Sequence, residues 1–541
     1  MKVGFFGMET PETQTKANPA LIKGLTFATG DAFTKAAADQ VAALKDADVV
    51  ICLAHLGVDA ESAPYRSTDL YAAVKGIDFI VDGHSHTVMT KGEKGEPIQS
   101  TGTAFKNIGV IVIDDASKKI ESNSLYEIKE DTAKDATVAA AAKVIVDRVN
   151  NEYGTKFATS KVELNGAKAP NGNRDVETNN GDLITDAMRW KVLQNKDGLT
   201  VNEDHVVAIT NGGGIRAAIA KGDVTKKDIN TVLPFGNTVA VVYVTGEQLL
   251  EALEASTFST PTAVGGFPQV SGINFTIHTG KAYDKNDATY PESTYYGPKT
   301  INRVVINSVN GKEFKANEVY AVVTNNFCAA GGDTYYAFKA ASAQFDTGIP
   351  LDEAVMEYVT KELKGVIGEQ YAAPQGRILL NPFKDVKVSS WFGKYVIDLY
   401  NDGIINGTSA TTYAPNDTLT WAAALKLLLV SHGDLKAADA TGADWSKNTI
   451  AKAAELGLVA ADLDGAKAIS RLEFCQVAAK LNKLAESKTE SKFTDCTDGY
   501  VMALVDAKVI NGMTETTFEP SATLTRAQIA KIIYQLNLIE K

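Results

Sequence analysis

Residues 48–57 read DVVICLAHLG and residues 77–86 read IDFIVDGHSH, so each stretch is an apolar run that leads into a histidine-bearing loop. Helix-type patterns occupy Ala32–Leu44 and Thr68–Val74, before the first run and between the two. Strands separated by helices build a parallel or mixed α/β layer, in which ligand groups collect at the carboxyl ends of the strands. Three histidines are expected at those ends: His55, His84 and His86.

The alternation defines a first expected domain at residues 1–130. Residues 131–155 then carry a helical pattern, and Gly154 provides its stop. The apolar stripe of this helix comprises Val138, Ala142, Ile145 and Val149. We interpret the segment as a helix that connects two domains.

Residues 156–380 form the second expected domain. Helix patterns cover Leu183–Leu193 and Gly246–Ala255, and the intervening loops are rich in glycine and asparagine. The strand patterns of this region are Val206–Ile209, Val239–Val244 and Val319–Thr324. The region is predicted to be a mixed α/β domain.

An internal repeat with a period of roughly 50 to 55 residues follows from Pro382 onward. Its first copy contains FKDV at 383–386, GIING at 403–407, YAP at 413–415 and LTW at 419–421. Its last copy contains FTD at 493–495, VING at 509–512, FEP at 518–520 and LTR at 524–526. With a weaker middle copy, the pattern predicts three small helical units at 381–434, 435–488 and 489–541.

Composition excludes several classes of protein. The 541 residues include 54 Lys and Arg against 66 Asp and Glu, a net charge of −12 that does not suit a nucleic-acid polymer as partner. The longest apolar runs, such as Ile108–Ile113, are far shorter than the roughly 18 residues of a membrane span. Four scattered cysteines indicate neither a disulfide framework nor a zinc knuckle. The opening Met1–Met8 does not read as a secretory signal.

The histidine loops carry a metal-site hypothesis. Imidazole suits zinc, manganese or iron, and two histidines one residue apart in a turn can reach one site. A lone His-x-His is more often an ordinary loop feature, so the pattern alone leaves both readings open. We assign no role to the remaining histidines: His205, His278 and His432.

AHLG at 54–57 and GHSH at 83–86 resemble the last two ligand motifs of the calcineurin-like metallophosphoesterase domain in the 5'-nucleotidase family. The resemblance implies a two-metal centre of divalent ions such as zinc or manganese, with the ligands His55, His84 and His86. The family's Asp-x-His, bridging Asp and Asn-His-Glu motifs have no match here, so no catalytic residue is assigned. We therefore expect a partial metallophosphoesterase sandwich, an incomplete metal site and little hydrolysis, from an N-terminally truncated chain whose signal peptide is lost.

A second set of motifs carries further ligand chemistry. Glycine runs let a backbone approach a ligand, arginines present planar forks to anions, and aromatic faces stack on a flat base. The motifs are RDVETNNGDL at 174–183, NGGGIR at 211–216, PFGN at 234–237, GGF at 265–267 and NFCAAGGD at 326–333. Each motif alone would be compatible with turns and core packing.

Together these motifs resemble the C-terminal nucleotide-recognition domain of the 5'-nucleotidases. The resemblance implies that Phe235 and Phe327 clamp a nucleobase across a slot ~7 Å wide, and that Asp333 accepts a hydrogen bond from a ribose hydroxyl. It further implies ribose or phosphate contacts from Arg174, Asn211 and Arg216. The full set of expected nucleotide-binding residues is Arg174, Asn211, Gly213, Arg216, Phe235, Asn237, Phe327, Gly332 and Asp333.

The terminal repeats resemble S-layer homology domains, which attach bacterial proteins to pyruvylated wall polysaccharide. The arginine at the start of a helix in each copy is the expected anion contact, which implicates Arg471 and Arg526. The first copy has Trp421 at this position. A role for these arginines as surface caps stays open.

The combined prediction is an extracellular phosphoesterase of the 5'-nucleotidase type, attached to a bacterial cell wall or S-layer, that releases phosphate from nucleotides, including 2',3'-cyclic ones. A non-catalytic nucleoside-binding or structural surface protein is the main alternative. A relative that acts on a different phosphoester is the third. Nucleotides or nucleosides and wall polysaccharide are the expected partners.

Overall fold

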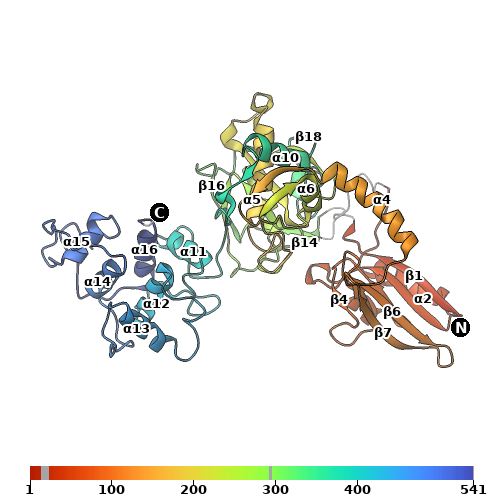
Figure 1. The fold of residues 1–541 in the computed structure, drawn as a ribbon, viewed down its shortest axis with the longest axis horizontal. Helices are drawn as coiled ribbons and strands as arrows, with labels where there is room; N and C mark the ends of the chain where they lie inside the picture. The colour runs from red at the N-terminus through yellow and green to blue at the C-terminus, as the bar shows by residue number, and fades with distance from the viewer. Residues whose placement is uncertain (14–23, 291–294, 540–541) are drawn as a thin grey trace. The chain divides into compact units, whose positions relative to one another are not determined.

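The computed structural model describes residues 1–13, 24–290 and 295–539 (Figure 1). Parts of the first expected domain and the last two residues of the third expected repeat lie outside this set. The chain divides into two compact units, each described separately below. Unit 1 comprises Met1–Ile273, Tyr283–Ile301 and Ser308–Arg377, and unit 2 comprises Asn274–Ala282, Asn302–Asn307 and Ile378–Lys541.

Unit 1 begins with a five-stranded sheet of order β1-β2-β3-β5-β4, in which only the pairing of β4 with β5 is antiparallel. Its strands are β1 (Val3–Glu9), β2 (Val49–His55), β3 (Phe79–Asp82), β4 (Val88–Met89) and β5 (Ile98–Thr101). The helices α2 (Asp31–Ala43) and α3 (Ser67–Ala73) contribute Phe33 and Leu70 to the core of this sheet. Because β2 and β3 are parallel neighbours, the histidine loops that follow them meet at one edge.

A hairpin and a long helix follow. The hairpin consists of β6 (Asn107–Asp114) and β7 (Lys119–Glu127), and the helix is α4 (Ala136–Tyr153). Asp135 caps α4, because its side chain accepts hydrogen bonds from the first free N–H groups. No residue of α4 is buried, and Val138 of the predicted apolar stripe is 67% exposed. The helix (Figure 1) is therefore exposed over most of its length, and near its C-terminal end it contacts α6 (Lys226–Val232), where Lys227 Nζ donates a hydrogen bond to Asn150 Oδ1 at 3.0 Å.

The second sheet of unit 1 has the order β12-β9-β17-β11-β18. Its strands are β9 (Val206–Asn211), β11 (Thr238–Thr245), β12 (Pro268–Ser271), β17 (Val319–Asn325) and β18 (Ala343–Pro350). The helices α5 (Asn179–Leu193) and α10 (Leu351–Lys361) share its core, and α7 (Gly246–Ser256) also contacts β11 and β17. All six residues of β9 are buried, so this strand reads as a continuous apolar run.

Smaller elements complete the mixed α/β part. A three-stranded sheet joins β8 (Lys156–Ser160) to β10 (Gly222–Thr225) and β19 (Val366–Ile367). Helix α6 (Lys226–Val232) precedes β11, and helix α5 begins four residues earlier than its sequence pattern suggests. The early start arises because the Thr178 side chain accepts a hydrogen bond from Gly181 N, a capping signal that lies outside the apolar pattern.

Unit 2 packs a three-stranded sheet against helices. The sheet has the order β16-β13-β20, with β13 (Ile273–Ile277), β16 (Val304–Val309) and β20 (Ile378–Leu380). The helices are α11 (Gly393–Asn401), α12 (Trp421–His432), α13 (Trp445–Glu455), α14 (Arg471–Leu481), α15 (Gly499–Asp506) and α16 (Arg526–Asn537). Within the described residues, no helix combines the length and the apolar character needed to cross a bilayer.

Three isolated β-bridges pair the segments that precede helices α12, α14 and α16 with one another. They pair Thr418 with Thr525, Thr420 with Ala468 and Ser470 with Thr523. Each bridge lies beside the start of a helix whose first turn is capped by a hydroxyl; the capping residues are Thr420, Ser470 and Thr525. The three expected repeats therefore contribute side chains to one shared hydrophobic core, so each repeat depends on the others to bury its apolar residues.

Candidate functional site

His55 and His84 lie together at the sheet edge. His55 ends β2, His84 lies in the loop after β3, and His55 Nε2 is 3.1 Å from His84 Nδ1. The backbone of His84 has φ 61° and that of His86 has φ 56°, in the left-handed region that residues with a side chain rarely adopt. Such strain concentrates where a loop must aim functional groups.

Asp82 fixes the shape of this loop pair. Its side chain accepts hydrogen bonds from Leu56 N at 3.0 Å, Gly57 N at 3.2 Å and Gly83 N at 2.8 Å. It also accepts one from the Ser67 hydroxyl at 2.5 Å. A buried carboxylate with four donors is fully engaged, so Asp82 is a structural tie between the two histidine loops.

Glu12 is a member of this cluster that the sequence analysis missed. Its side chain is 2% exposed, and its Oε2 lies 3.2 Å from His84 Nε2. A carboxylate beside one ring nitrogen of an imidazole selects the tautomer that keeps its proton on that nitrogen. Glu12 therefore directs the lone pair of His84 Nδ1 toward His55. The sequence offered only a weak signal, because Glu12 lies in a loop far along the chain from both histidines.

The spacing of the two histidines can be compared with that of two ligands on one metal ion. Two nitrogen ligands on one zinc ion, each ~2.0 to 2.1 Å from the metal, lie about 3.0 to 3.4 Å apart, and the His55 and His84 nitrogens are 3.1 Å apart. Among the residues that the structure describes, no group of three His, Cys, Asp or Glu side chains could hold an ion. His86 does not complete the pair, and burial lowers its pKa. The cluster fits two ligands of one ion and does not by itself make a two-metal centre.

The second group of candidate residues gathers at one edge of the β9–β17–β11 sheet. Strands β9 and β17 are parallel, so Asn211 and Asn325 end them at the same edge, and β11 begins there because it runs antiparallel to β17. The loop before β11 carries Phe235, and the turn after β17 carries Phe327. The PFGN motif at 234–237 and the NFCAAGGD motif at 326–333, which are far apart in the sequence, thus lie at the same edge of the sheet.

Direct contacts join these loops. Asn211 Nδ2 donates a hydrogen bond to Asp333 Oδ2 at 2.7 Å, and Gly213 N donates to Gly265 O at 2.7 Å. Both Asn211 and Asp333 are buried, and Asp333 has φ 51°. A Cβ on Gly332 would lie 2.4 Å from the Phe327 ring, so only glycine fits there. The expected residues Asn211, Gly213, Gly332 and Asp333 are therefore brought together.

The two phenylalanines differ in exposure. Phe235 is 58% exposed, which rules out a core role, whereas Phe327 is half-buried against Gly332. The Arg216 guanidinium carbon lies 5.5 Å from the centroid of the Phe235 ring. One hollow beside these groups is lined by Thr210, Gly214, Leu233, Phe235, Asn237, Asn325 and Leu351. The width of the slot between the two phenylalanine rings stays a prediction.

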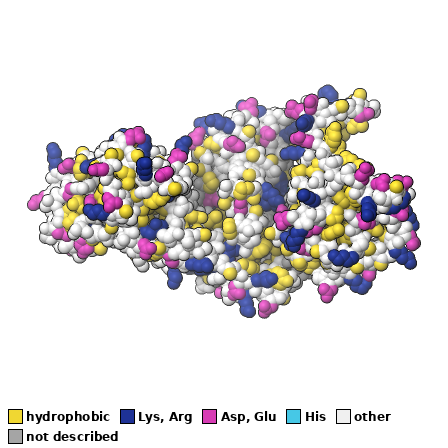
Figure 2. All heavy atoms as spheres, turned by 90° about the horizontal axis from the view of Figure 1, so that it is seen from below, with side chains coloured by type: hydrophobic (Ala, Val, Ile, Leu, Met, Phe, Trp, Pro, Cys, Tyr) yellow, Lys and Arg dark blue, Asp and Glu magenta, His cyan; other side chains and the backbone are white. Residues whose placement is uncertain are grey.

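Positive charge is concentrated locally at this edge. Burial lowers the pKa of Arg216, and the charge of Arg174 lowers it further. Two guanidinium groups near each other favour an anion between them. Figure 2 shows Lys and Arg side chains interspersed with Asp and Glu side chains on the face it draws. Attraction of an anionic ligand therefore depends on this pair, since the net charge is −12.

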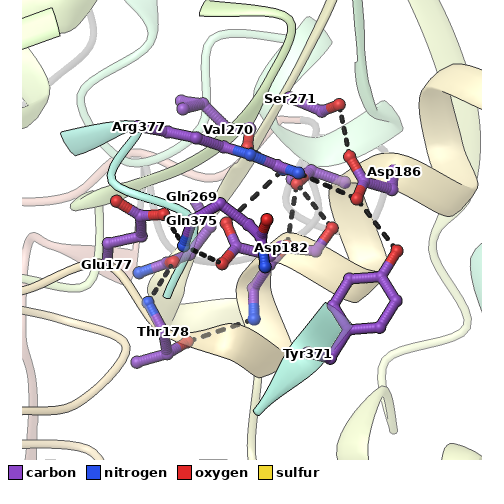
Figure 3. Close-up of polar contacts among 12 residues, drawn as sticks. Glu177, Thr178, Asp182, Asp186, Gln269, Val270, Ser271, Tyr371, Gln375 and Arg377 are labelled. Carbon is purple, nitrogen blue, oxygen red and sulfur yellow. Dashed lines mark hydrogen bonds and ion pairs between the residues drawn. The ribbon is translucent and has the colours of Figure 1, made fainter. Parts of the chain in front are cut away.

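Most residues of the RDVETNNGDL motif are buried behind the ligand loops and make hydrogen bonds that hold those loops in place. Gln269 accepts a hydrogen bond from Thr178 N at 3.0 Å (Figure 3). It also donates hydrogen bonds to Asn173 O at 3.1 Å and Val176 O at 2.8 Å. Buried amide contacts of this kind fix the loop that carries Arg174. Arg174 is the residue of this motif that the sequence analysis expects to bind nucleotide, and the structure shows which of its neighbours support the loop.

A carboxylate network lies beneath the same motif (Figure 3). Gln375 N donates to Glu177 Oε1 at 2.8 Å and to Asp182 Oδ2 at 3.1 Å, while Arg377 pairs with Asp186 at 2.8 Å. Asp182 is fully buried, and burial followed by the charge of Glu177 raises its pKa to about 9. Asp182 is thus protonated at neutral pH, and the network ties residues 369–377 to helix α5.

The S-layer-type arginines reach across the repeats. Arg526 donates to Tyr413 O at 2.7 Å and Asn406 O at 2.8 Å, and its guanidinium carbon lies 4.5 Å from the Tyr413 ring centroid. Arg471 donates to Asn511 O at 2.7 Å and lies 4.6 Å from the Phe518 ring centroid. Each arginine therefore binds backbone and an aromatic face of another copy, a role that the sequence did not anticipate.

Trp421 takes the corresponding position in the first copy. It is 7% exposed, and its backbone N donates to Lys467 O at 2.9 Å. The middle copy lacks the YAP-type segment that supplies the ring and carbonyl groups to the arginines elsewhere. An apolar side chain suits this junction because a guanidinium would lack those acceptors.

Cys328 lies inside the ligand loops. It is fully buried, and burial raises the pKa of its thiol well above the usual range. A thiol in this environment is unreactive, so Cys328 serves as a small packing residue next to Phe327.

The fold is that of a mixed α/β protein followed by a helical repeat region. The sequence matches the family "5'-nucleotidase, C-terminal domain" over residues 156–340. It matches the S-layer homology domain over residues 382–424 and 495–530. The chain therefore contains a 5'-nucleotidase C-terminal domain and S-layer homology domains. The expected α/β class and helical C-terminal region are confirmed.

Several relatives support this assignment. The trifunctional nucleotide phosphoesterase protein YfkN of Bacillus subtilis is 32% identical over 401 residues, which cover 70% of this chain and 24% of that protein. The human 5'-nucleotidase is 27% identical over 412 residues, covering 70% of this chain and 66% of the human protein. The crystal structure of a 5'-nucleotidase precursor from Thermus thermophilus superposes with a TM-score of 0.50 at 27% identity, covering 70% of this chain and 72% of that one.

The carboxylate network predicts a pH effect on stability. The pKa of Asp182 is raised from 3.8 to about 9 on folding, so between these values the folded state holds a proton that the unfolded state has lost. Stability from this group therefore falls as pH rises, by up to about 1.4 kcal/mol per pH unit. Asp182→Asn mimics the protonated form, so its melting temperature should rise relative to wild type between pH 5 and pH 8.

Thermal unfolding of both proteins across this pH range measures the effect. Asp197→Asn, an exposed control in the same domain, should leave the profile unchanged. Parallel pH profiles for wild type and Asp182→Asn would show that Asp182 is ionised in the folded protein.

Proposed function

We propose that this chain is a cell-wall-attached member of the 5'-nucleotidase type of phosphoesterase, that it recognises nucleotides through residues 156–380, and that its histidine cluster alone is catalytically incomplete. The observation that carries the proposal is the convergence of its ligand-type loops at one sheet edge, fixed by the 2.7 Å hydrogen bond between Asn211 and Asp333. Only a ligand with both a flat ring and hydroxyl or phosphate groups would use aromatic faces, a buried carboxylate and paired guanidinium groups together.

Each group has a role in this proposal. Phe235 and Phe327 stack on the two faces of the base, and Asp333 accepts a hydrogen bond from a ribose hydroxyl. Arg174 and Arg216 hold the phosphate or the ribose, with Asn211 beside them. Gly213, Asn237 and Gly332 line the approach to the ligand. Stacking tolerates any base, so this arrangement selects nucleotides as a class.

The histidine cluster has the metal role. In the proposal, His55 and His84 bind a divalent ion such as zinc or manganese, with His86 as the further family-type ligand. Such ions activate water and neutralise charge on a phosphoryl group. Glu12 would keep His84 in the ligating tautomer.

A second candidate is a non-catalytic nucleoside-binding surface protein. The observation that favours it concerns the pair of His55 and His84. Among the described residues, no third His, Cys, Asp or Glu side chain joins the two in a group that could hold an ion. Both candidates share the recognition domain and differ in hydrolysis.

The repeat region supplies attachment in either case. We propose that residues 381–541 bind secondary wall polysaccharide, with Arg471 and Arg526 near the ligand, and that the protein works outside the cell. Two of the three junctions between copies combine an arginine with an aromatic ring, and the Trp421 junction does not. The proposal therefore gives two binding junctions.

Nucleoside binding tests the recognition role. Phe235→Ala and Phe327→Ala should each weaken adenosine binding by ~1 to 3 kcal/mol, the cost of one base stack, which is roughly five-fold to over a hundred-fold in Kd. Phe345→Ala is the control, because Phe345 is a 43% exposed ring on β18. Calorimetry with the intact chain measures all four proteins. Equal affinities in wild type and both phenylalanine variants would contradict the clamp.

Phosphate release tests whether the histidine cluster is catalytically incomplete. Residues 1–541 by themselves should release no more phosphate from AMP, with added manganese or zinc, than a His55→Ala/His84→Ala variant, because a lone imidazole pair cannot assemble a two-metal centre. Phosphate release that depends on both histidines would show instead that the chain is a complete hydrolase.

Sedimentation with purified bacterial wall polysaccharide tests attachment. Arg471→Gln/Arg526→Gln should reduce the bound fraction several-fold, while the exposed control Lys480→Gln should not. Melting temperatures of the variants show whether unit 2 stays folded. If a folded double variant binds wall polysaccharide as well as wild type does, the proposed ligand contact is wrong, and Arg471 and Arg526 only hold the repeats together.

A further inference from the structure

Asn325 lies at the centre of the edge where the ligand loops meet. It is the last residue of β17 and is 1% exposed. Its Nδ2 donates hydrogen bonds to Thr210 Oγ1 and Asn211 Oδ1, both at 3.0 Å, and its Oδ1 accepts one from Cys328 N at 2.8 Å. No sequence motif singled it out, because it precedes the NFCAAGGD stretch and reads as the end of a strand.

The amide orientation of Asn325 is determined by chemistry. A backbone N–H can only donate, so the oxygen of the Asn325 amide must face Cys328 N and the nitrogen must face Asn211. Asn211 then presents its oxygen to Asn325 and its own nitrogen to Asp333, at 2.7 Å. Donors and acceptors therefore run in one direction from Cys328 to Asp333, and no amide can flip without placing like groups against each other.

The other side of Asn325 holds the turn that carries Phe327. Asn325 is the N-cap of α8 (Asn326–Ala329), through its contact with Cys328 N. The Asn326 side chain also accepts a hydrogen bond from Thr238 N at 3.3 Å, which ties the turn to the start of β11. The position of the Phe327 backbone thus depends on the same amide that orients Asn211.

We propose that Asn325 is a positioning residue that couples the two halves of the ligand grip, the base stack on Phe327 and the ribose contact on Asp333. This inference rests on the proposed nucleotide recognition and adds a residue to it. One buried amide sets the distance between a carboxylate and an aromatic face, so it favours a ligand in which a hydroxylated sugar is joined to a flat ring. The ligand class is therefore the intact nucleoside moiety, in preference to a free base.

Two substitutions separate the two arms of the coupling. Asn325→Asp and Asn325→Ser each keep an oxygen that can cap α8, because Asp and Ser are good N-cap residues. Neither can donate to Asn211 as the amide does: the carboxylate has no N–H, and the serine side chain is shorter. Asn310→Asp is the matched control, because Asn310 Nδ2 donates to Asp204 O and Val206 O at the opposite end of β9.

The experiment compares adenosine with adenine by calorimetry on the intact chain. Both Asn325 variants should bind adenosine at least about ten-fold more weakly than wild type, since a hydrogen-bonded charged group loses its orientation. They should bind adenine within about two-fold of wild type, because the capped turn keeps Phe327 in place. Adenosine binding at wild-type strength in either folded variant would overturn the proposal.

A double-mutant cycle with Asp333→Asn distinguishes positioning from general loss of structure. If Asn325 acts through Asp333, then Asn325→Ser should cost little further adenosine affinity once Asp333→Asn is present. Additive losses would overturn the coupling. Failure of wild type to bind adenosine or adenine would instead refute the proposed nucleotide recognition, so the two outcomes are distinguishable.

Discussion

The hydrogen bond from Asn211 Nδ2 to Asp333 Oδ2 joins two loops that are 122 residues apart in the sequence. It can form only because β9 and β17 are parallel and end at the same edge, with Val322 opposite Val207 in register. A shift of this register by one residue would exchange the side chains on the two covered faces of the sheet and move the ends of the two strands apart. The apolar run of β9 therefore determines where the polar ligand groups meet, and the recognition edge depends on packing several residues away from it.

Buried hydrogen bonds and ion pairs behind the ligand loops also stabilise this edge of the sheet. Gln269 holds the loop of Arg174, and the Glu177–Asp182 pair with Arg377 ties the segment 369–377 to α5. Asp182 stays protonated because burial and a neighbouring carboxylate disfavour its charge. The motif thus combines one half-buried cationic group, Arg174, with several buried polar side chains that hold the loop in place. Rigid support of this kind keeps ligand groups in a fixed geometry.

Sequence patterns predicted much of this molecule. Apolar periodicity gave the strands β9, β11 and β17, and the glycine-rich loops pointed to the residues around Asn211 and Asp333. Periodicity could not reveal Asn325 or Glu12, because each acts through partners brought close only by strand pairing. The resemblance to S-layer homology domains implied an anion contact for Arg471 and Arg526 and left a capping role open; the structure adds backbone and aromatic partners in another repeat. The sequence shows which residues carry a charge, but it does not show which groups each charged side chain contacts in the fold.

The structure of the intact chain with bound adenosine tests the central claim most directly. The account predicts that the base lies between the rings of Phe235 and Phe327 and that a ribose hydroxyl donates to Asp333, with Asn211 still hydrogen-bonded to that carboxylate. Adenosine bound elsewhere on the chain, or bound with Asp333 turned away from the ribose, would contradict it.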